Sequence, residues 1–134
     1  MIVAVCIDDK NGMMFHQRRQ SRDRLQISDL VAVSGERKIR IHPYSQLLFE
    51  DYPDHIATDE HFLDDAGEDD ICFVENVDLS PYTDRIHRLI LYRWNRHYPS
   101  DLKLTLDLSR FVLQQTTDFQ GSSHHKITRE EYSR

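Results

Sequence analysis

Four arginines fall within seven consecutive residues of an otherwise acidic chain: Arg18, Arg19, Arg22 and Arg24. Guanidinium groups offer paired N–H donors to phosphates and carboxylates, so such a cluster could bind an oxyanion. The alternative is a solvated loop in which the arginines pair with local acids such as Asp8, Asp9 and Asp23. This segment is the best candidate for a binding surface in the sequence, and we expect a small anionic ligand there.

Eight histidines raise the question of a metal site. Such a site needs three or four ligands brought together, often with two of them spaced to point the same way. His124 and His125 are adjacent, so in a strand they would point to opposite faces. The other histidines follow no ligand pattern, and we expect no metal.

Two kinds of nucleophile are present. Cys6 and Cys72 each lie in an apolar run, which predicts buried thiols, and thiols buried away from cations are unreactive. Ser122-Ser123-His124 places hydroxyls beside an imidazole, but no acid that could orient the imidazole is evident. We interpret this tripeptide as a turn.

Nucleic-acid binding has one supporting segment, Arg88 to Tyr98, in which basic and aromatic residues alternate and could stack bases and contact phosphates. The chain has 134 residues, with 17 Lys and Arg against 23 Asp and Glu, a net charge of −6. That acidity disfavours nucleic acid as a partner and favours a strand with its aromatic side chains packed on one face.

The length indicates a single domain, residues 1–134. No run of about 18 apolar residues is present, and an apolar strand starts at Ile2, so we expect no membrane association and no leader peptide. With two unpaired cysteines, this predicts a cytoplasmic protein.

The elements that would position these residues follow an α/β order. Ile2–Ile7 and Ile71–Val74 are apolar throughout, which predicts central strands covered on both faces. Between them a polar loop over 13–20, a helix over 22–33 capped by Ser21, and a strand over 38–41 near the sheet edge are expected.

Further strands or short helices are expected over 44–49, 55–58, 60–66 and 80–85. The last third predicts an antiparallel meander of three strands, over 88–94, 110–117 and 124–132. In the first of these, Leu89 and Leu91 should face one side and Ile90, Tyr92 and Trp94 the other. The sequence therefore predicts a three-layer α/β fold whose mixed sheet has a parallel core and an antiparallel C-terminal edge.

This order resembles the dihydrofolate reductase fold over nearly the whole chain. Ile2–Val5 followed by Asn11-Gly12-Met13 is similar to that family's opening strand and the loop behind it. Ser21 to Leu25 resembles its Pro-x-Asp-Leu helix start, and 82–92 its Ala-Asp-x-Leu-Tyr-Leu-Thr stretch. The resemblance implies that Asp23 takes the place of the carboxylate that holds the pteridine ring, which makes Asp23 the one catalytic candidate.

The arginines that flank Asp23 favour the ionised carboxylate. We therefore expect Asp23 to form an ion pair with them, or to lie in the first turn of a helix where the dipole favours an acid, and not to relay protons.

The same resemblance argues against the family's reaction, because its reductases hold the pyrophosphate of NADPH with backbone N–H groups at glycine-containing turns. Where the glycine pair is expected, this sequence has Val74-Glu75-Asn76-Val77, and His42-Pro43-Tyr44-Ser45 replaces Gly-Arg-x-Thr. Glu75 would repel a phosphate, and Pro43 removes a donor. We expect no cofactor and no NADPH-dependent dihydrofolate reductase activity.

The favoured function is a ligand-binding or interaction module, with these binding residues: Arg18, Arg19, Arg22, Asp23 and Arg24. An enzyme acting on a small anionic or nucleotide substrate in the same cleft is the alternative. The chain is also similar to short bacterial proteins labelled ribonuclease Z, which would imply RNA processing. The His-x-His-x-Asp-His zinc run of that activity is absent. A protein partner and a homodimer are left open.

Overall fold

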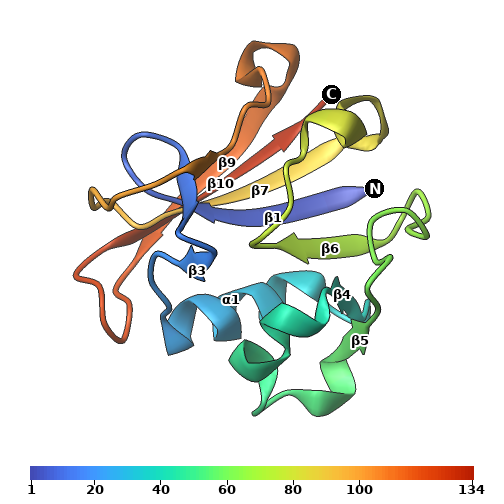
Figure 1. Ribbon diagram of the computed structural model, residues 1–134, viewed down its shortest axis with the longest axis horizontal. Coiled ribbons are helices and arrows are strands. Elements are labelled where there is room, and N and C mark those ends of the chain that lie inside the picture. Colours follow the sequence, from blue (N-terminus) through green and yellow to red (C-terminus); the bar gives the residue numbers. More distant parts are fainter.

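A seven-stranded sheet forms the centre of the computed structural model, which describes residues 1–134 (Figure 1). In spatial order its strands are β5 (Ile56–Thr58), β4 (Ile39–Ile41), β6 (Ile71–Val74), β1 (Ile2–Ile7), β7 (Arg88–Arg93), β10 (Ile127–Ser133) and β9 (Val112–Phe119). Pairing from β5 to β7 is parallel, and β10 pairs antiparallel with both β7 and β9. The predicted parallel core with an antiparallel C-terminal edge is confirmed.

The middle of the sheet is covered on both faces. β1 lies between β6 and β7, with Val3 opposite both Cys72 and Leu89. Val3 and Leu89 face one apolar core, whereas Ala4 and Ile90 face the other. This two-sided burial explains why β1 and β6 are apolar throughout, as predicted.

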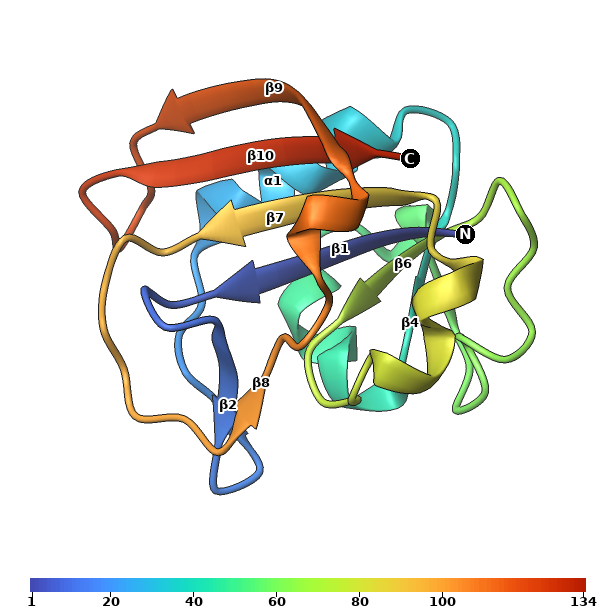
Figure 2. The same ribbon diagram turned by 90° about the horizontal axis from the view of Figure 1, so that it is seen from above.

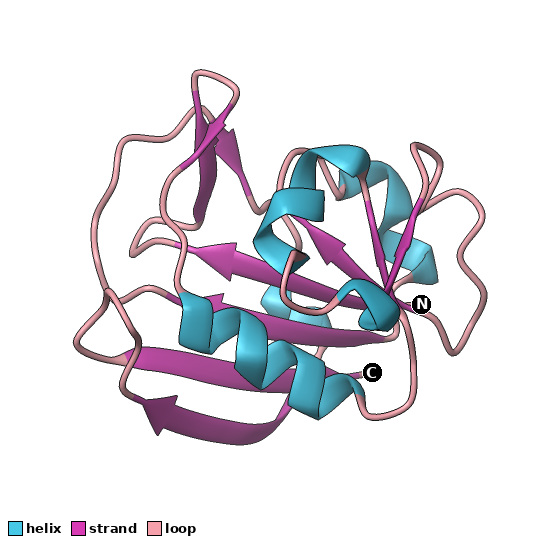
Figure 3. Ribbon diagram, turned by 90° about the horizontal axis from the view of Figure 1, so that it is seen from below, coloured by secondary structure: helices cyan, strands magenta, loops and turns pink.

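Different elements cover the two faces (Figures 2 and 3). One core is closed by α1 (Arg24–Ser34) and the 3₁₀ helix η1 (Pro43–Phe49), through Ile27, Leu30 and Phe49. The opposite core is closed by the segment 62–66, by residues flanking the 3₁₀ helix η3 (Ser80–Arg85), and by a small second sheet. The central sheet and the elements packed on its two faces form the three predicted layers. None of the helices is long and apolar enough to cross a bilayer.

The predicted loop over residues 13–20 is wrong, because this segment forms a hairpin of β2 (Gly12–Phe15) and β3 (Arg18–Arg19). β8 (Leu102–Lys103) pairs with β2 to complete the small sheet. The hairpin turns at His16 and Gln17, which both have positive φ, 50° and 62°. Hairpin turns of this kind favour Asn and Gly, so His-Gln gave no turn signal in the sequence.

The ends of one helix and the order of the C-terminal strands also differ from expectation. Asp23, not Ser21, caps α1, and the helix begins at Arg24 and ends at Ser34, followed by the C-cap Gly35, whose φ is +62°. The three C-terminal strands do not form a simple meander, because β10 inserts between β7 and β9. The ion pair between Arg93 and Glu130 joins β7 to β10, two strands that are not consecutive in the chain.

Of the remaining short elements, η1, β5 and η3 fall close to the predicted ranges. The 3₁₀ helices η2 (Pro53–His55) and η4 (Leu108–Arg110) were not predicted. Within β7, Leu89 and Leu91 face one core, and Ile90 and Tyr92 face the other, as expected from the alternation. The first part of the basic and aromatic segment, Arg88–Arg93, is therefore a packed strand, and Tyr92 and Trp94 are buried.

Candidate functional site

Asp23 is the N-cap of α1 and is only 2% exposed. Its backbone is extended, and its Oδ1 accepts the N–H groups of Leu25 at 2.9 Å and Gln26 at 3.3 Å. Two of the donors that a helix start leaves without partners are thus satisfied by one carboxylate. Asp23 thus lies at the helix start as the N-cap, one position before the first turn in which it was expected.

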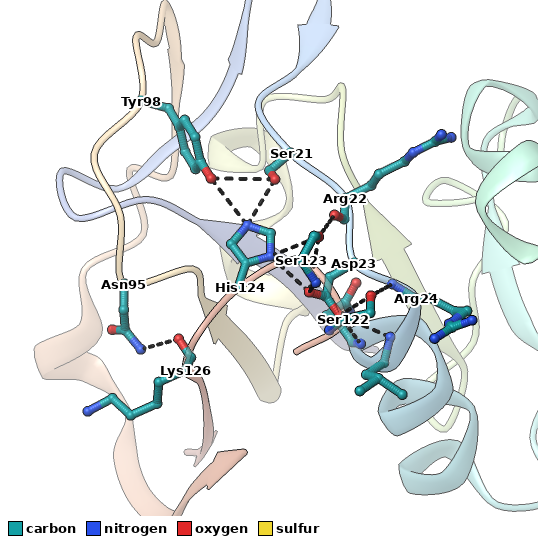
Figure 4. A network of polar contacts seen from close by, with 12 residues as sticks. Ser21, Arg22, Asp23, Arg24, Asn95, Tyr98, Ser122, Ser123, His124 and Lys126 are labelled. Atoms are coloured by element: carbon teal, nitrogen blue, oxygen red, sulfur yellow. Dashed lines mark hydrogen bonds and ion pairs between the residues drawn. The ribbon is translucent and has the colours of Figure 1, made fainter. Parts of the chain in front are cut away.

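The loop between β9 and β10 folds over this carboxylate (Figure 4). Ser122 donates its backbone N–H to Oδ1 at 2.9 Å, and Ser123 donates its own to Oδ2 at 2.8 Å. Gly121 makes this approach possible, because a Cβ there would overlap the Asp23 carboxylate and Ile127. Asp23 therefore joins the start of α1 to the loop 121–125.

His124 completes the contacts of Asp23, and the two residues lie 101 positions apart in the chain. Nδ1 of His124 is 2.9 Å from Oδ2 of Asp23, and both side chains are buried. The imidazole stacks on Trp94, with ring centres 4.4 Å apart and planes 18° from parallel. Its position is thus fixed by a carboxylate at one edge and an indole against its face.

The other imidazole nitrogen faces two hydroxyl groups (Figure 4). Nε2 of His124 lies 2.9 Å from Oγ of Ser21 and 3.2 Å from the hydroxyl of Tyr98. The Tyr98 hydroxyl is also 3.5 Å from Oγ of Ser21. Ser122-Ser123-His124 lies in a bend between two strands, as predicted. The expectation that no acid orients the histidine is wrong, since Asp23 supplies that acid from a distant part of the chain.

The charge of the pair follows from its surroundings. Burial alone would raise the pKa of the Asp23 carboxyl, but the hydrogen bonds from His124 and from the Ser122 and Ser123 backbone hold that pKa well below its ordinary value. Because Asp23 is ionised, Nδ1 of His124 carries the proton that faces it. In the neutral imidazole, Nε2 is then an acceptor for a hydroxyl proton.

The four arginines do not gather at one place. Arg19 forms a two-point contact with Glu75, Nε to Oε2 at 2.9 Å and Nη2 to Oε1 at 3.1 Å, and its guanidinium lies over the Tyr44 ring. Arg18 and Arg19 border an open depression beside Tyr98 and Pro99. Arg22 and Arg24 belong to a different hollow.

That hollow is a cleft of about 300 Å³ between the start of α1, the end of η1 and the loop 122–123. It is lined by Arg22, Asp23, Arg24, Ile27, Leu47, Leu48, Glu50, Asp51, Tyr52, Ser122 and Ser123. In Figure 4 the side chains of Arg22 and Arg24 point away from His124. The arginines that form ion pairs are elsewhere: Arg19, Arg93, Arg110 and Arg129.

The expected pairing of the clustered arginines with Asp8, Asp9 or Asp23 is therefore wrong. Asp23 contacts His124, and Asp8 accepts the backbone N–H groups of Gly12 at 2.7 Å and Lys10 at 2.9 Å. Asp8 is thus satisfied by backbone groups of the turn that follows it, and Asp23 by an imidazole from a distant part of the chain.

A second, narrow hollow adjoins the cleft and shares Arg22, Ile27 and Leu48 with it. It has room for only about 20 Å³ and is bordered by Ser21, Cys6 and Trp94. Gln26 also borders it, and Nε2 of this buried amide has no hydrogen-bond partner. A space of this size holds a single water or one oxygen atom of a ligand.

The carboxyl ends of β4 and β6 carry polar residues of their own. Glu75 follows β6 and is 9% exposed, and its Oε1 accepts the Ser45 hydroxyl at 2.8 Å. Together with Arg19 this makes a closed set of contacts around the Glu75 carboxylate. Cys72, within β6, is fully buried, and burial raises the pKa of its thiol to about 11.

The fold is that of a dihydrofolate-reductase-like α/β domain. A solved dihydrofolate reductase from Enterococcus faecalis, complexed with NADP(H) and RAB-propyl, is similar to this chain with a TM-score of 0.66 and 10% identity. The similarity covers 100% of this chain and 96% of that one, and at such identity it concerns the fold alone. No protein-family model and no curated protein sequence matches the chain.

Proposed function

We propose that this chain is a small-molecule-binding domain whose ligand occupies the cleft at the start of α1. The observation that carries the proposal is that Arg22 and Arg24 border a hollow of about 300 Å³ without pairing with an acid. That volume is within the range of small-ligand sites. Guanidinium groups left free at the wall of a cleft favour a ligand with a carboxylate or phosphate group.

Acidic residues in the same cleft restrict which ligands it can bind. Glu50 and Asp51 border the same cleft, so a ligand with several negative charges would be repelled there. Leu47 is 59% exposed and adds apolar surface. The best match is therefore a small molecule with one anionic group near the arginines and an amino group near the acids, as in a free amino acid or an amino-acid conjugate.

We also propose that the domain does not bind NADP(H), which is present in the Enterococcus faecalis structure. In open α/β sheets, ligands bind outside the carboxyl ends of the strands. Here Glu75 lies at the end of β6 with its carboxylate held by Arg19 and Ser45. A pyrophosphate brought to this place would meet a negative charge and would have to break these contacts.

Calorimetric titration with three probes tests this function: glutamate, glutarate and NADPH. Glutamate carries an ammonium group and two carboxylates, so it offers both predicted groups at a net charge of −1, whereas glutarate lacks the amino group and has a net charge of −2. We expect glutamate to bind more tightly than glutarate, and NADPH not to bind.

Arg24→Ala should weaken glutamate binding by about ten- to a hundredfold, as expected for the loss of a hydrogen bond to a charged group. The matched control is Arg96→Ala, since Arg96 is exposed and lies outside the cleft. Equal binding of glutamate to the two variants, or a thermal stabilisation by NADPH, would overturn the proposal.

A further inference from the structure

We propose that Ser21, His124 and Asp23 form a nucleophile, base and acid relay that hydrolyses small carboxylic esters. Oγ of Ser21 is 2.9 Å from Nε2 of His124, and Nδ1 of His124 is 2.9 Å from Oδ2 of Asp23. This is the order of contacts that activates a serine, and it is recognised by geometry and not by position in the chain. The proposed reaction is separate from the binding site proposed above, because Ser21 does not line the 300 Å³ cleft.

The burial of the relay supports a chemical role. Asp23 and His124 are 2% and 4% exposed, while Ser21 at the end of the relay is half-buried. The Asp23 carboxylate is held by backbone N–H groups from two elements, and Trp94 holds the plane of the imidazole. The base is therefore kept in one tautomer and one orientation, with its free nitrogen toward the hydroxyl.

Tyr98 shares the same nitrogen and so affects the serine. Nε2 of a neutral imidazole has one lone pair, and both hydroxyls cannot donate to it at once. When Ser21 donates to His124, the Tyr98 hydroxyl is left to donate to Oγ of Ser21, 3.5 Å away. Tyr98 is thus a positioning residue that orients the serine oxygen.

The narrow hollow beside Ser21 provides a place for the developing charge. Gln26 borders this hollow, and its Nε2 is a buried donor without a partner. Attack on an ester places negative charge on the carbonyl oxygen, and an N–H donor fixed near that oxygen stabilises the transition state. The available space of about 20 Å³ fits one oxygen atom.

The reaction needs only the ester and water. Oγ of Ser21 bonds to the carbonyl carbon while Nε2 of His124 takes the hydroxyl proton. The bond from this carbon to the alcohol oxygen then breaks, and the alcohol leaves with the proton from His124. Water attacks the resulting Ser21 ester in the same way, which releases the carboxylic acid and restores the serine hydroxyl and the neutral imidazole.

The preferred ester follows from the neighbouring cleft, and this part alone rests on the proposed function. Arg22 borders both hollows, so the acid part of an ester at Ser21 can extend toward Arg22 and Arg24. We expect an ester whose acid part carries a second, free carboxylate. The reactivity of Ser21 itself does not depend on the arginines.

A fluorophosphonate probe, read by peptide mass spectrometry on the whole chain, tests the serine directly. We expect one adduct per chain, on Ser21, that is absent in Ser21→Ala. Ser28→Ala is the matched control, because Ser28 is partly buried in α1 and makes no side-chain hydrogen bond. No adduct on the native protein, or labelling that persists in Ser21→Ala, would overturn the relay.

Turnover of p-nitrophenyl acetate gives the second measurement. Asp23→Asn should lower kcat by a factor of about 10² to 10⁴, as expected when the acid no longer fixes the tautomer of the base. Asn is as good a helix N-cap as Asp, so this variant keeps α1, and its circular dichroism should match the wild type. His125→Ala, an exposed neighbour, should keep the wild-type rate. Equal rates for Asp23→Asn and the wild type would refute the role of Asp23.

The mono-p-nitrophenyl ester of glutaric acid separates the relay from the cleft. Arg24→Ala should lower kcat/KM for this anionic ester about tenfold, whereas Arg96→Ala, outside the cleft, should keep the wild-type rate on both esters. If Arg24→Ala affects neither ester while Ser21→Ala abolishes both rates, the anion site fails and the relay stands. If neither ester is hydrolysed faster than in buffer, the relay fails whether or not glutamate binds.

Discussion

Replacement of Asp23 by alanine should destabilise the whole domain, because one buried carboxylate holds a helix start and a distant loop together. Loss of an N-cap side chain costs about 1 kcal/mol. Loss of the ionised acceptor of a buried hydrogen bond costs about 1–3 kcal/mol, since the donor is left without a partner. That donor is Nδ1 of the neutral His124 imidazole, at 2.9 Å from Oδ2.

The two values overlap, and water can reach part of the loop because Ser122 and Ser123 are exposed. We therefore expect Asp23→Ala to lower the free energy of unfolding by about 2–4 kcal/mol in total. That is a large share of the roughly 5–15 kcal/mol typical of a domain. The corresponding decrease in Tm is on the order of 10–15 °C.

Urea denaturation followed by circular dichroism measures this loss, with the slope of the transition checked for equality among variants. Asp65→Ala is the matched control, because Asp65 is exposed and has no side-chain contact. Asp23→Asn should fall between the two, since it keeps the cap but loses the charge that faces His124. A loss below about 1 kcal/mol for Asp23→Ala would refute the idea that this carboxylate joins the two segments.

Acid should lower the free energy of unfolding through the same carboxylate. The pKa of Asp23 is lower in the folded than in the unfolded chain, so its contribution to that free energy is complete above about pH 4 and is lost as the pH falls further. The free energy of unfolding, measured by urea denaturation from pH 6 to pH 2, should therefore depend less on pH for Asp23→Asn than for the wild type. An equal pH dependence of the two proteins would contradict this. Gly121→Ala should lower the free energy of unfolding by about 1–3 kcal/mol, because the added methyl group overlaps Asp23 and Ile127; calorimetric Tm values measure it, and an unchanged Tm would be the opposing result. Cys72 should resist iodoacetamide at pH 8 in the native state and react after unfolding, since burial raises the pKa of its thiol to about 11; mass spectrometry distinguishes the two, and fast native labelling would count against the buried strand.

Elements with a local cause were predictable. β1 and β6 are apolar on both faces because both faces are covered, and β7 alternates because its two faces pack against different cores. The hairpin of β2 and β3 was missed because its turn, His16-Gln17, adopts positive φ without the residues that usually indicate it. The insertion of β10 between β7 and β9 was missed because alternation reveals a strand but not its neighbours.

The candidate site was harder to predict than the fold. Asp23 was singled out by its position and Arg22 and Arg24 by their charge, and the structure brings these three to one cleft. His124 and Tyr98 were missed as partners because they lie 101 and 77 positions from Asp23 and Ser21. The usable signal was weak: a glycine and two serines directly before a histidine, the composition of a tight loop that can fold over an acid.

The place of β10 in the sheet has a consequence for how the protein is made. β10 is the last strand in sequence, yet two other strands need it as a neighbour, and the loop just before it carries His124. When the ribosome has synthesised the chain only as far as β9, Ser21 and Asp23 are present, but His124 has not yet been added. The nascent chain can therefore complete neither the sheet nor the Asp23–His124 contact until His124 and β10 have been synthesised.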